Sequence, residues 1–271
     1  MKRFTKKSKK YTLIIVLVLV VLILYNVIDN NRIRVVEDVV SIKNLPSNFE
    51  GFTILHITDL HGKEFGKNQS KLTYKINNID YDMIAITGDM KDIHSDNIDP
   101  FLDIMKNINN KEYIFYVPGN TDLDSFNKEI EASGVNILEK TYEINRDGQV
   151  IEIDKLDVTK VEDDSDKVRI GLFHYPMTLD DYNKDEYDLI LSGHYHGGQV
   201  RVPFYGALFI PHVNGGKFFP SQDEVSGLKD YKLFKQYTSR GLGANSAWKL
   251  LKFRLFNTPE INVIRLVNDE K

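Results

Sequence analysis

The sequence predicts an α/β domain with a largely parallel sheet, preceded by one apolar helix at the N-terminus. Five apolar runs rich in β-branched residues recur after residue 50 without polar alternation, which is typical of strands buried on both faces. Helix candidates separate the first three runs and follow the third, and this alternation favours parallel strands joined by crossover helices. No internal repeat or linker divides the chain after residue 35, which indicates one folded domain.

The N-terminal segment has the pattern of a membrane anchor. Six of the first ten residues are Lys or Arg, and the apolar stretch that follows, 11–28, has no polar residue from Leu13 to Leu24. As a helix, this stretch would rise about 27 Å, close to the ~30 Å thickness of a bilayer's hydrocarbon core. A cleaved signal peptide is the alternative, but no small-residue cleavage site follows the apolar stretch.

The charge distribution predicts the topology of the chain. We expect a basic cytoplasmic flank over 1–10, a transmembrane anchor over 11–28, a polar tether over 29–35 and the folded domain over 36–271. Because basic flanks stay in the cytoplasm, the predicted localisation is the cell membrane, single-pass, with the domain on the extracytoplasmic side. A domain on the cytoplasmic face is the alternative.

The elements of the domain follow in order along the chain. Two alternating runs around Asp147 and Gly148 predict a hairpin, and the charged segment 160–167 is expected to be a solvated loop. Helices are expected in "KNQSKLTYKINNI", "DPFLDIMKNIN" and "LDSFNKEIEASG". Strands are expected in "RVVEDVVSIKNL", "FTILHITDL", "YDMIAITGDM", "EYIFYVPGN", "VRIGLFHYP", "YDLILSGHYHGG" and "EINVIRLV".

The composition excludes several kinds of chemistry. The chain has no cysteine, so it can form no disulfide and offers no thiolate as metal ligand or nucleophile. Outside the basic flank it carries 29 basic and 39 acidic residues, a net charge of −10. An acidic body argues against nucleic acid as the main partner.

Each of the five apolar runs ends in side chains that can bind metal. The carboxyl ends of parallel strands face one crevice, so we expect these side chains to meet in space. Within one strand end, Asp59 and His61 point the same way because side chains repeat every two residues. The predicted metal ligands are Asp59, His61, Asp89, Asn120, His174, His194 and His196.

This set of side chains indicates two metal ions. Carboxylate, amide and imidazole ligands without sulfur suit Mn, Fe or Zn better than Ca or Mg. Seven ligands are too many for one tetrahedral ion and suit two ions that share a bridging carboxylate. Paired divalent ions are a device for hydrolysing phosphoesters, since they generate hydroxide near neutral pH and stabilise the oxygens of the displacement.

The same residues resemble the motifs of the calcineurin-like metallophosphoesterases. The family pattern of D-x-H, G-D, G-N-H-[DE], a lone H and G-H-x-H is matched here, in order, by "DLH", "GD", "GNTD", "FH" and "GHYH". Within the family, the chain is most similar to the membrane-associated bacterial subgroup of YkuE and YaeI. The segment "SRGLGANSAWKLLKFRLFNTPEINVIRL" looks like the extended tail of that subgroup.

The resemblance implies a four-layer α/β/β/α sandwich and a specific division of the ligands. It implies Asp89 as the bridge between two metal ions, with attack on phosphorus by a metal-bound hydroxide. It implies a phosphomonoester, phosphodiester or pyrophosphate as substrate, with a lipid-linked or cell-wall component favoured by the subgroup. Asp59, His61 and His196 would hold one ion, and Asn120, His174 and His194 the other.

The sequence departs from the family motif at one position. Where the family has a histidine thought to protonate the leaving group or hold the phosphate, this chain has Thr121. Its hydroxyl can donate a hydrogen bond to phosphate but cannot act as a cationic acid. The open alternatives are weak catalysis, a substrate that needs no acid, or replacement by another side chain. The predicted catalytic residues are Asp89, Asn120, Thr121 and Asp122, and the replacements considered are His94, Tyr175 and Tyr195.

Two functions are therefore compared. The first is a membrane-anchored dinuclear-metal phosphoesterase. The second is a non-catalytic, metal-dependent binding protein for phosphorylated envelope components, which the replacement at Thr121 favours and the complete ligand set opposes. The aromatic segments "FYGALF" and "KFF" are expected to pack in the core, with a membrane-facing lip as the alternative.

Overall fold

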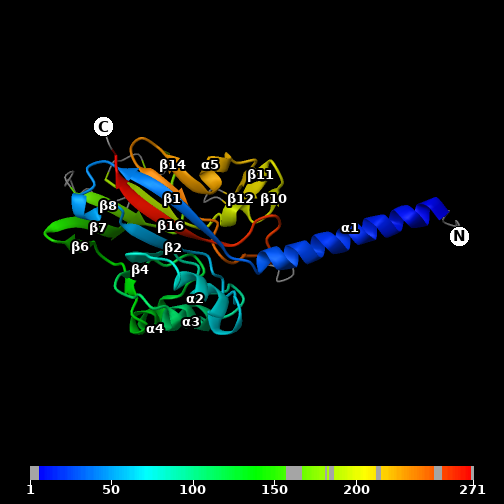
Figure 1. Ribbon diagram of the computed structural model, residues 1–271, viewed down its shortest axis with the longest axis horizontal. Coiled ribbons are helices and arrows are strands. Elements are labelled where there is room, and N and C mark those ends of the chain that lie inside the picture. Colours follow the sequence, from blue (N-terminus) through cyan, green and yellow to red (C-terminus); the bar gives the residue numbers. More distant parts are fainter. Residues whose placement is uncertain are drawn as a thin grey trace.

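The computed structural model describes residues 6–156, 167–180, 182, 186–211, 215–246 and 252–269. Residues 1–5 of the expected basic flank and nearly all of the expected charged loop at 160–167 lie outside these ranges. Two six-stranded sheets form the centre of the domain, and one long helix projects from it (Figure 1).

The first sheet contains strands from both ends of the domain. Strands β2, β3 and β4 are parallel, as the sequence predicts, and β5, which was not expected, extends the parallel set. Strand β16 runs parallel to β1 and antiparallel to β2. The C-terminal strand therefore lies between the first two strands of the domain. Across the sheet the order is β1 (Arg34–Ile42), β16 (Glu260–Asn268), β2 (Thr53–Ile57), β3 (Met83–Ile86), β4 (Ile114–Tyr116) and β5 (Asn136–Ile137).

The second sheet has a parallel centre and an antiparallel hairpin at each edge. The predicted hairpin is formed by β6 and β7, and Asp147 and Gly148 turn the chain with φ of 51° and 85°. Strands β7, β8, β9 and β15 are parallel to one another. The order is β14 (Gly227–Asp230), β15 (Lys235–Thr238), β9 (Leu189–Ser192), β8 (Val168–Leu172), β7 (Gln149–Lys155) and β6 (Tyr142–Arg146).

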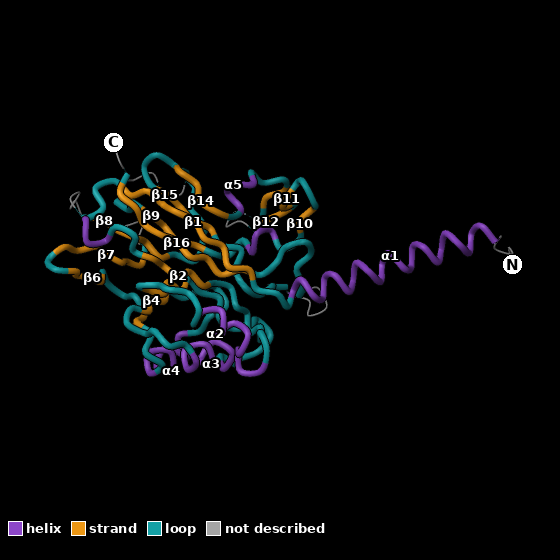
Figure 2. Tube along the Cα trace, viewed as in Figure 1, coloured by secondary structure: helices purple, strands orange, loops and turns teal. Residues whose placement is uncertain are grey.

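Apolar side chains hold the layers together. One buried cluster joins the inner faces of the two sheets, and another joins the first sheet to helices α2 (Ser70–Ile76), α3 (Asp99–Asn107) and α4 (Asn127–Ala132). Figure 2 shows these three helices gathered on one side of the strands. On the outer face of the second sheet, the described residues form a third apolar cluster around Tyr187 and Ile190 without a long helix. The mixed α/β fold is confirmed.

Short helices complete the domain, and two short pairs of strands form a small lobe near the end of α1 that meets the domain (Figure 1). The short helices are η1 (Ser47–Phe49), η2 (Lys67–Gln69), η3 (Asp124–Phe126), η4 (His196–Gly198) and α5 (Gln222–Val225). The lobe contains two antiparallel pairs, formed by β10 (Arg201–Val202) with β11 (Gly206–Ala207) and by β12 (Phe209–Ile210) with β13 (Lys217–Phe218).

Helix α1 (Lys6–Asn30) projects from the domain and is apolar on all sides. Its segment Lys9–Asn30 is long and apolar enough to cross a membrane, a test that an N-terminal signal sequence also passes. Only residues 31–33 separate α1 from β1, and Asp29 is buried against the domain. The segment expected to be a polar tether is thus the end of the helix, a short turn and the start of β1.

Candidate metal centre

The seven predicted ligands all follow the carboxyl ends of strands. Asp59 and His61 follow β2, Asp89 follows β3 and Asn120 follows β4, while His174 follows β8 and the last two histidines follow β9. Five of them have left-handed backbone conformations: φ is 53° at Asp59, 47° at His61, 55° at Asp89, 64° at His194 and 50° at His196. Such conformations cost about 1 to 3 kcal/mol each, so the surrounding contacts must hold these turns in place.

Backbone contacts between neighbouring turns hold the strained residues. The Asp59 and His61 amides donate to the carbonyls of Gly88 and Asp89 over 3.0 and 2.9 Å. A side chain at Gly88 would place its Cβ 2.2 Å from the Gly119 nitrogen, and one at Gly119 would place it 2.3 Å from Asp89 Oδ1. The turns after β2, β3 and β4 are therefore packed directly against one another, which requires glycine at 88 and 119.

The turns bring the ligand atoms into two groups. One contains Asp59, His61 and His196, and within each group the possible ligand atoms lie within 4.8 Å of one another. The other contains Asp89, His174 and His194, and here the Asn120 Oδ1 atom lies 3.1 Å from His174 Nε2. The grouping agrees with the division of ligands that the family resemblance implies.

Asp89 lies between the two groups. Its Oδ2 atom is 3.4 Å from His61 Nε2 and also 3.4 Å from His174 Nε2. This oxygen is buried and has no well-aligned hydrogen-bond partner among the described residues. A buried carboxylate oxygen without a partner is costly in an apo protein, and a metal ion would satisfy it. Asp89 therefore has the position that a bridging ligand needs.

The imidazole orientations also fit metal binding. His174 Nδ1 lies 2.8 Å from the Thr87 carbonyl, so this nitrogen carries the proton and the lone pair of the neutral ring is on Nε2. That lone pair points at His194 Nδ1, 3.1 Å away. In the other group, the Nε2 atoms of His61 and His196 face each other at 3.2 Å. Nitrogen lone pairs that converge in this way are the arrangement a cation requires.

Burial determines the charges in the absence of metal. It lowers the pKa of His61 to about 4 and that of His196 well below its usual value, so both rings are neutral ligands at pH 7. Burial also raises the pKa of Asp59 to about 7. At His174, burial is outweighed by the neighbouring Asp89 carboxylate, which raises the pKa of the ring to about 9, so that without metal its Nε2 also carries a proton. A bound cation would displace that proton.

A comparison with protein families shows which family this chain belongs to. The model of the calcineurin-like phosphoesterases matches residues 52–198, which contain all seven candidate ligands. The chain belongs to this family. Metallophosphoesterases use divalent metal ions, and the two groups of ligands are the candidate positions for them.

Two curated relatives match most of the chain, and a third matches about a third of it. An uncharacterized metallophosphoesterase of Campylobacter jejuni, Cj0846, is 28% identical over 96% of this chain and 73% of its own length. YkuE of Bacillus subtilis, also named an uncharacterized metallophosphoesterase, is 26% identical over 88% of this chain and 87% of its own. The phosphodiesterase YaeI of Escherichia coli is 35% identical, over 36% of this chain and 32% of its own.

Solved structures with a related fold are more distant. The crystal structure of the phosphopantetheinyl hydrolase PptH from Mycobacterium tuberculosis covers 72% of this chain and 91% of its own, with a TM-score of 0.44 at 10% identity. The Escherichia coli phosphoesterase Yfce covers 72% and 83%, with a TM-score of 0.35 at 12% identity. Likenesses at this level do not bear on the substrate.

Asp122, predicted among the catalytic residues, holds two turns of this metallophosphoesterase together. Its carboxylate accepts hydrogen bonds from the amides of Asp89, Met90 and Lys91 at 2.6, 2.9 and 3.0 Å, and from Gly119 at 2.9 Å. With four backbone donors, both oxygens are occupied. In this structure Asp122 acts on the metal centre through the backbone of Asp89.

Thr121, at the position of the missing family histidine, is also bound to Asp89. Its amide donates to Asp89 Oδ1 over 2.8 Å, and its buried hydroxyl lies 3.0 Å from that oxygen and 3.0 Å from the Lys91 carbonyl. The hydroxyl is therefore engaged with the candidate bridging carboxylate, where the sequence reasoning considered a hydrogen bond to phosphate. Thr121 positions Asp89.

Thr121→Val is expected to weaken metal binding. The substitution keeps the shape and the backbone bond but removes the hydroxyl, and loss of such a supporting partner costs about 10- to 100-fold in metal affinity. The Mn²⁺ affinity can be measured by isothermal titration calorimetry, with Thr121→Ser as the control that keeps the hydroxyl. Equal affinities in the Val and Ser variants would show that the hydroxyl does not support Asp89.

The replacement acids considered from the sequence lie in different surroundings. The Tyr175 ring is 5.0 Å from the His174 ring and 4.5 Å from the His194 ring, so it borders the second group of ligands. His94 Nε2 lies 2.8 Å from the Ser246 carbonyl. Tyr195 is buried in the apolar interior of the small lobe. The Tyr195 ring is 6.0 Å from the His194 ring, so Tyr175 is the tyrosine that lies closer to the ligands.

The C-terminal segment supplies positioning residues that the sequence reasoning missed. Fully buried Arg254 donates to the carbonyls of Gly241, Gly243 and His196 at 3.2, 2.7 and 3.3 Å, and to Asn257 at 2.9 Å. The Asn257 amide donates to the same His196 carbonyl over 2.7 Å. Burial lowers the pKa of Arg254 to about 10, so it stays charged at pH 7. The charged residues inside the apolar run "LLKFRLFN" were the available signal.

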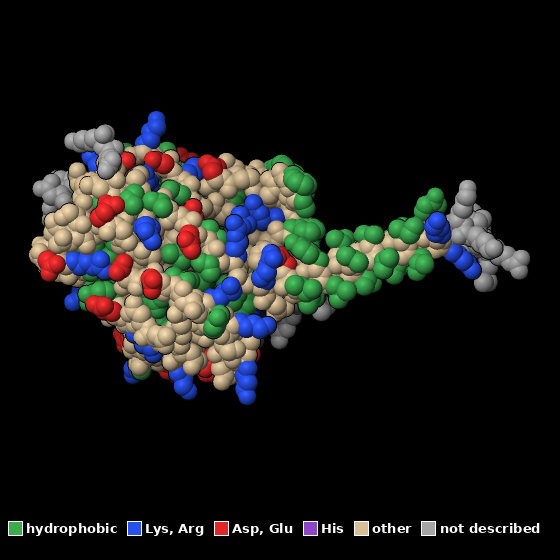
Figure 3. Space-filling view, viewed as in Figure 1, with side chains coloured by type: hydrophobic (Ala, Val, Ile, Leu, Met, Phe, Trp, Pro, Cys, Tyr) green, Lys and Arg blue, Asp and Glu red, His purple; other side chains and the backbone are tan. Residues whose placement is uncertain are grey.

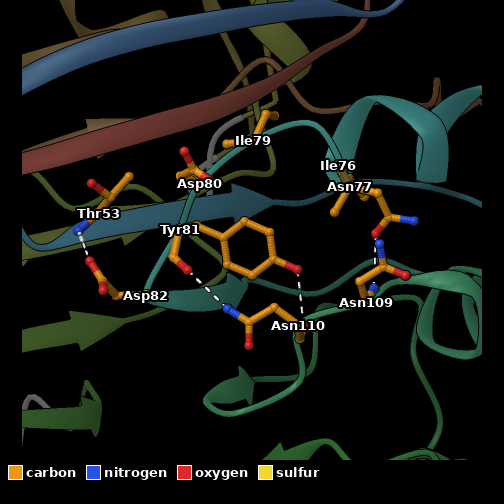
Figure 4. Close-up of a pocket in the computed structure, with 9 residues that line it drawn as sticks. All are labelled: Thr53, Ile76, Asn77, Ile79, Asp80, Tyr81, Asp82, Asn109 and Asn110. Carbon is orange, nitrogen blue, oxygen red and sulfur yellow. Dashed lines mark hydrogen bonds between the residues drawn. The ribbon is translucent and has the colours of Figure 1, made fainter.

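A hollow at the opposite ends of β2 and β3 has a structural role (Figure 4). Its polar groups are paired within the chain: the Thr53 amide donates to Asp82 over 2.7 Å, and Tyr81 exchanges two hydrogen bonds with Asn110. These residues lie at the amino ends of the strands, whereas the candidate ligands follow the carboxyl ends. The hollow is therefore separate from the metal centre.

Proposed function

We propose that this metallophosphoesterase is a membrane-anchored hydrolase that uses two divalent metal ions to cleave a phosphomonoester, phosphodiester or pyrophosphate. The observation that carries the proposal is the position of Asp89, whose unpartnered Oδ2 is equally close to a histidine of each ligand group. Mn, Fe or Zn ions suit the oxygen and nitrogen ligands. When bound, such ions supply a nucleophile near neutral pH and stabilise the charge on the phosphate oxygens.

The chain's own residues would hold the ions and orient the ester. Asp59, His61 and His196 would bind one ion, and His174, His194 and Asn120 the other, with Asp89 shared between them. Residue 121 is a threonine, so it offers no imidazole to protonate the leaving group, and its hydroxyl is already bound to Asp89. We therefore expect a preference for esters whose leaving group departs without a proton.

Hydrolysis of model esters tests this function. The full chain in detergent micelles, loaded with Mn²⁺, is expected to hydrolyse p-nitrophenyl phosphate or bis(p-nitrophenyl) phosphate, since p-nitrophenolate leaves without an acid. Rates should fall steeply along a series of aryl esters with poorer leaving groups, and Thr121→His should reduce that dependence. Thr121→Ser is the matched control. A flat series in the parent chain would contradict the absence of a general acid.

The alternative is a metal-dependent binding protein for phosphorylated envelope components. Thr121 favours it, because the family's proton donor is replaced by a residue that cannot act as a cationic acid. A chain that binds metal and phosphate esters, yet turns over no ester even as Thr121→His, would support this alternative.

The anchoring part of the proposal rests on α1 and its basic flank. The flank favours a cytoplasmic N-terminus and an extracytoplasmic domain. Protease added to intact cells should then degrade the domain and leave the flank protected. A domain that becomes accessible only after lysis would place the hydrolase on the cytoplasmic face.

A further inference from the structure

Five exposed aromatic side chains on the small lobe form a surface that we call the aromatic rim. The exposed fractions are 112% for Phe204, 49% for Tyr205, 40% for Phe209, 73% for Phe218 and 67% for Phe219. The expectation that "FYGALF" and "KFF" pack in the core is wrong for these side chains, because only their neighbours, such as Ala207 and Ile210, are buried. Soluble proteins rarely leave a contiguous apolar patch in water, so the rim calls for a partner.

Four of the five rim residues contact one another in two ring pairs. Phe209 and Phe218 are directly opposite in the pairing of β12 with β13, and their ring centroids are 5.0 Å apart. Tyr205 and Phe219 meet edge to face at 6.2 Å. The two pairs are joined through the adjacent residues Phe218 and Phe219, and fully exposed Phe204 precedes Tyr205 in the chain.

The lobe that carries the rim packs directly on the metal centre. A Cβ at Gly198, two residues after His196, would lie 2.3 Å from the Ala207 Cβ and 3.0 Å from the Phe209 carbonyl. The backbone of β11 and β12 therefore abuts the turn that presents His196. A surface that engages the rim would therefore lie beside the turn that carries His196.

The same end of the domain carries the end of α1. The Asn30 side chain donates to the Arg254 carbonyl over 2.7 Å and accepts from the Arg254 amide over 3.0 Å. Arg254 in turn donates to the His196 carbonyl, and Lys252 donates to the His61 carbonyl over 2.8 Å. The segment 252–254 thus connects the last turn of α1 to two candidate ligands, His61 in the first metal-binding motif and His196 in the last.

The space-filling view shows where the hydrophobic side chains of the small lobe lie relative to α1. Hydrophobic side chains gather at the edge of the domain from which α1 emerges, over the lobe of β10–β13 (Figure 3). The apolar stretch of α1 ends at Ile28, and its side chains from Leu13 to Leu24 are exposed, whereas Asp29 is buried against the domain. A bilayer crossed by α1 would therefore begin near Ile28, beside the edge where the rim is exposed.

We infer that the aromatic rim rests in the interfacial layer of the bilayer that α1 crosses and turns the metal centre toward the lipid headgroups. Aromatic side chains favour this layer, where their rings leave water beside an anchoring helix. The inference deepens the proposed function, on which it rests: the substrate class is an amphiphile whose phosphoester lies at headgroup level.

Spin labels test the contact without reference to catalysis. Because the chain has no cysteine, Phe204→Cys and Phe218→Cys can each be labelled specifically in the full chain. Tyr142→Cys is the control, since Tyr142 is 40% exposed on β6, at the end of the domain opposite α1 (Figure 1). In nanodiscs of phosphatidylcholine and phosphatidylglycerol, the two rim labels should collide more often with oxygen than with a water-soluble nickel complex. The control label should collide more often with the nickel complex than with oxygen.

Two results would overturn the inference. Rim labels as accessible to the nickel complex as the control label would show that the rim stays in water. Rim labels that are wet in nanodiscs but protected in native membranes would assign the surface to a protein partner. Neither readout depends on hydrolysis, so failure of the proposed activity can be told apart from failure of the membrane contact.

The substrate class is tested by removing the rim. The variant Phe204→Ser/Phe218→Ser should keep the parent rate on soluble bis(p-nitrophenyl) phosphate. On a vesicle lipid with a p-nitrophenyl phosphodiester headgroup, its rate should fall about tenfold or more, since misplacement of a site against its substrate is costly. Equal losses on both esters, or no loss on the lipid, would contradict an amphiphilic substrate presented by the bilayer.

Discussion

Asp89→Asn is expected to abolish phosphoester turnover while the domain stays folded. The substitution keeps the size of the side chain but removes the negative charge that both ligand groups share. Loss of a single group that stabilises charge in a site costs about 10² to 10³ in kcat, and loss of a shared metal ligand should cost at least as much. Initial rates on bis(p-nitrophenyl) phosphate at saturating Mn²⁺ measure the effect.

Asp96→Asn is the matched control for this substitution. Asp96 lies on the loop that follows Asp89, its side chain is 82% exposed, and it pairs with the Lys91 ammonium at 3.2 Å. The Asp96 carboxylate is solvated, and buried Lys91 keeps the carbonyls of Asp92 and Ser95 as acceptors, so this variant should keep the parent rate. An Asp89→Asn enzyme that retains turnover within a few-fold of Asp96→Asn would refute the bridging role.

Arg254→Met is expected to cause the largest loss of stability. Methionine fills most of the space but leaves the carbonyls of Gly243 and Asn257 without the donor described for them, while those of Gly241 and His196 keep backbone or Asn257 donors. Each buried unsatisfied group costs about 1 to 3 kcal/mol. A loss of at least about 2 kcal/mol lowers the Tm of a domain this size by roughly 4 to 8 °C. Thermal unfolding of the full chain in detergent, followed by circular dichroism, measures the shift.

The control for Arg254→Met is Arg265→Met on β16. Arg265 is exposed, and surface substitutions of this kind usually change stability by less than about 0.5 kcal/mol. The buried substitution should also weaken metal binding, because Arg254 holds the carbonyl of His196. If Arg254→Met had the same Tm as Arg265→Met, the buried guanidinium would not be holding the turns in place.

The candidate site was largely predictable from the sequence because its residues are tied to strand ends. A buried strand that stops at Asp59 or Asp89 puts a polar group at the sheet edge where parallel strands meet, and the structure brings all seven candidate ligands there. Local patterns also predicted β1 to β4, β8, β9 and β16 and the hairpin at Asp147 and Gly148, but not β5 or the strands β10 to β15. These inferences needed only neighbouring residues.

The remaining features depend on pairings between distant parts of the chain. The insertion of β16 between β1 and β2 and the contacts of Arg254 with Asn30 and His196 have no local signature. Thr121 was read as a contact for phosphate because its partner, Asp89, lies 32 residues earlier. The rim was assigned to the core because composition does not reveal that Phe204 and Phe218 point outward.

The central claim, that Asp89 joins two metal ions in one hydrolytic centre, is tested most directly by titrating the metal-free full-length chain with Mn²⁺. Bound metal and turnover of bis(p-nitrophenyl) phosphate are measured in the same samples. The account predicts two ions per chain, with turnover that appears only as the second ion binds. A single ion at saturation, or full turnover with the first ion, would contradict it.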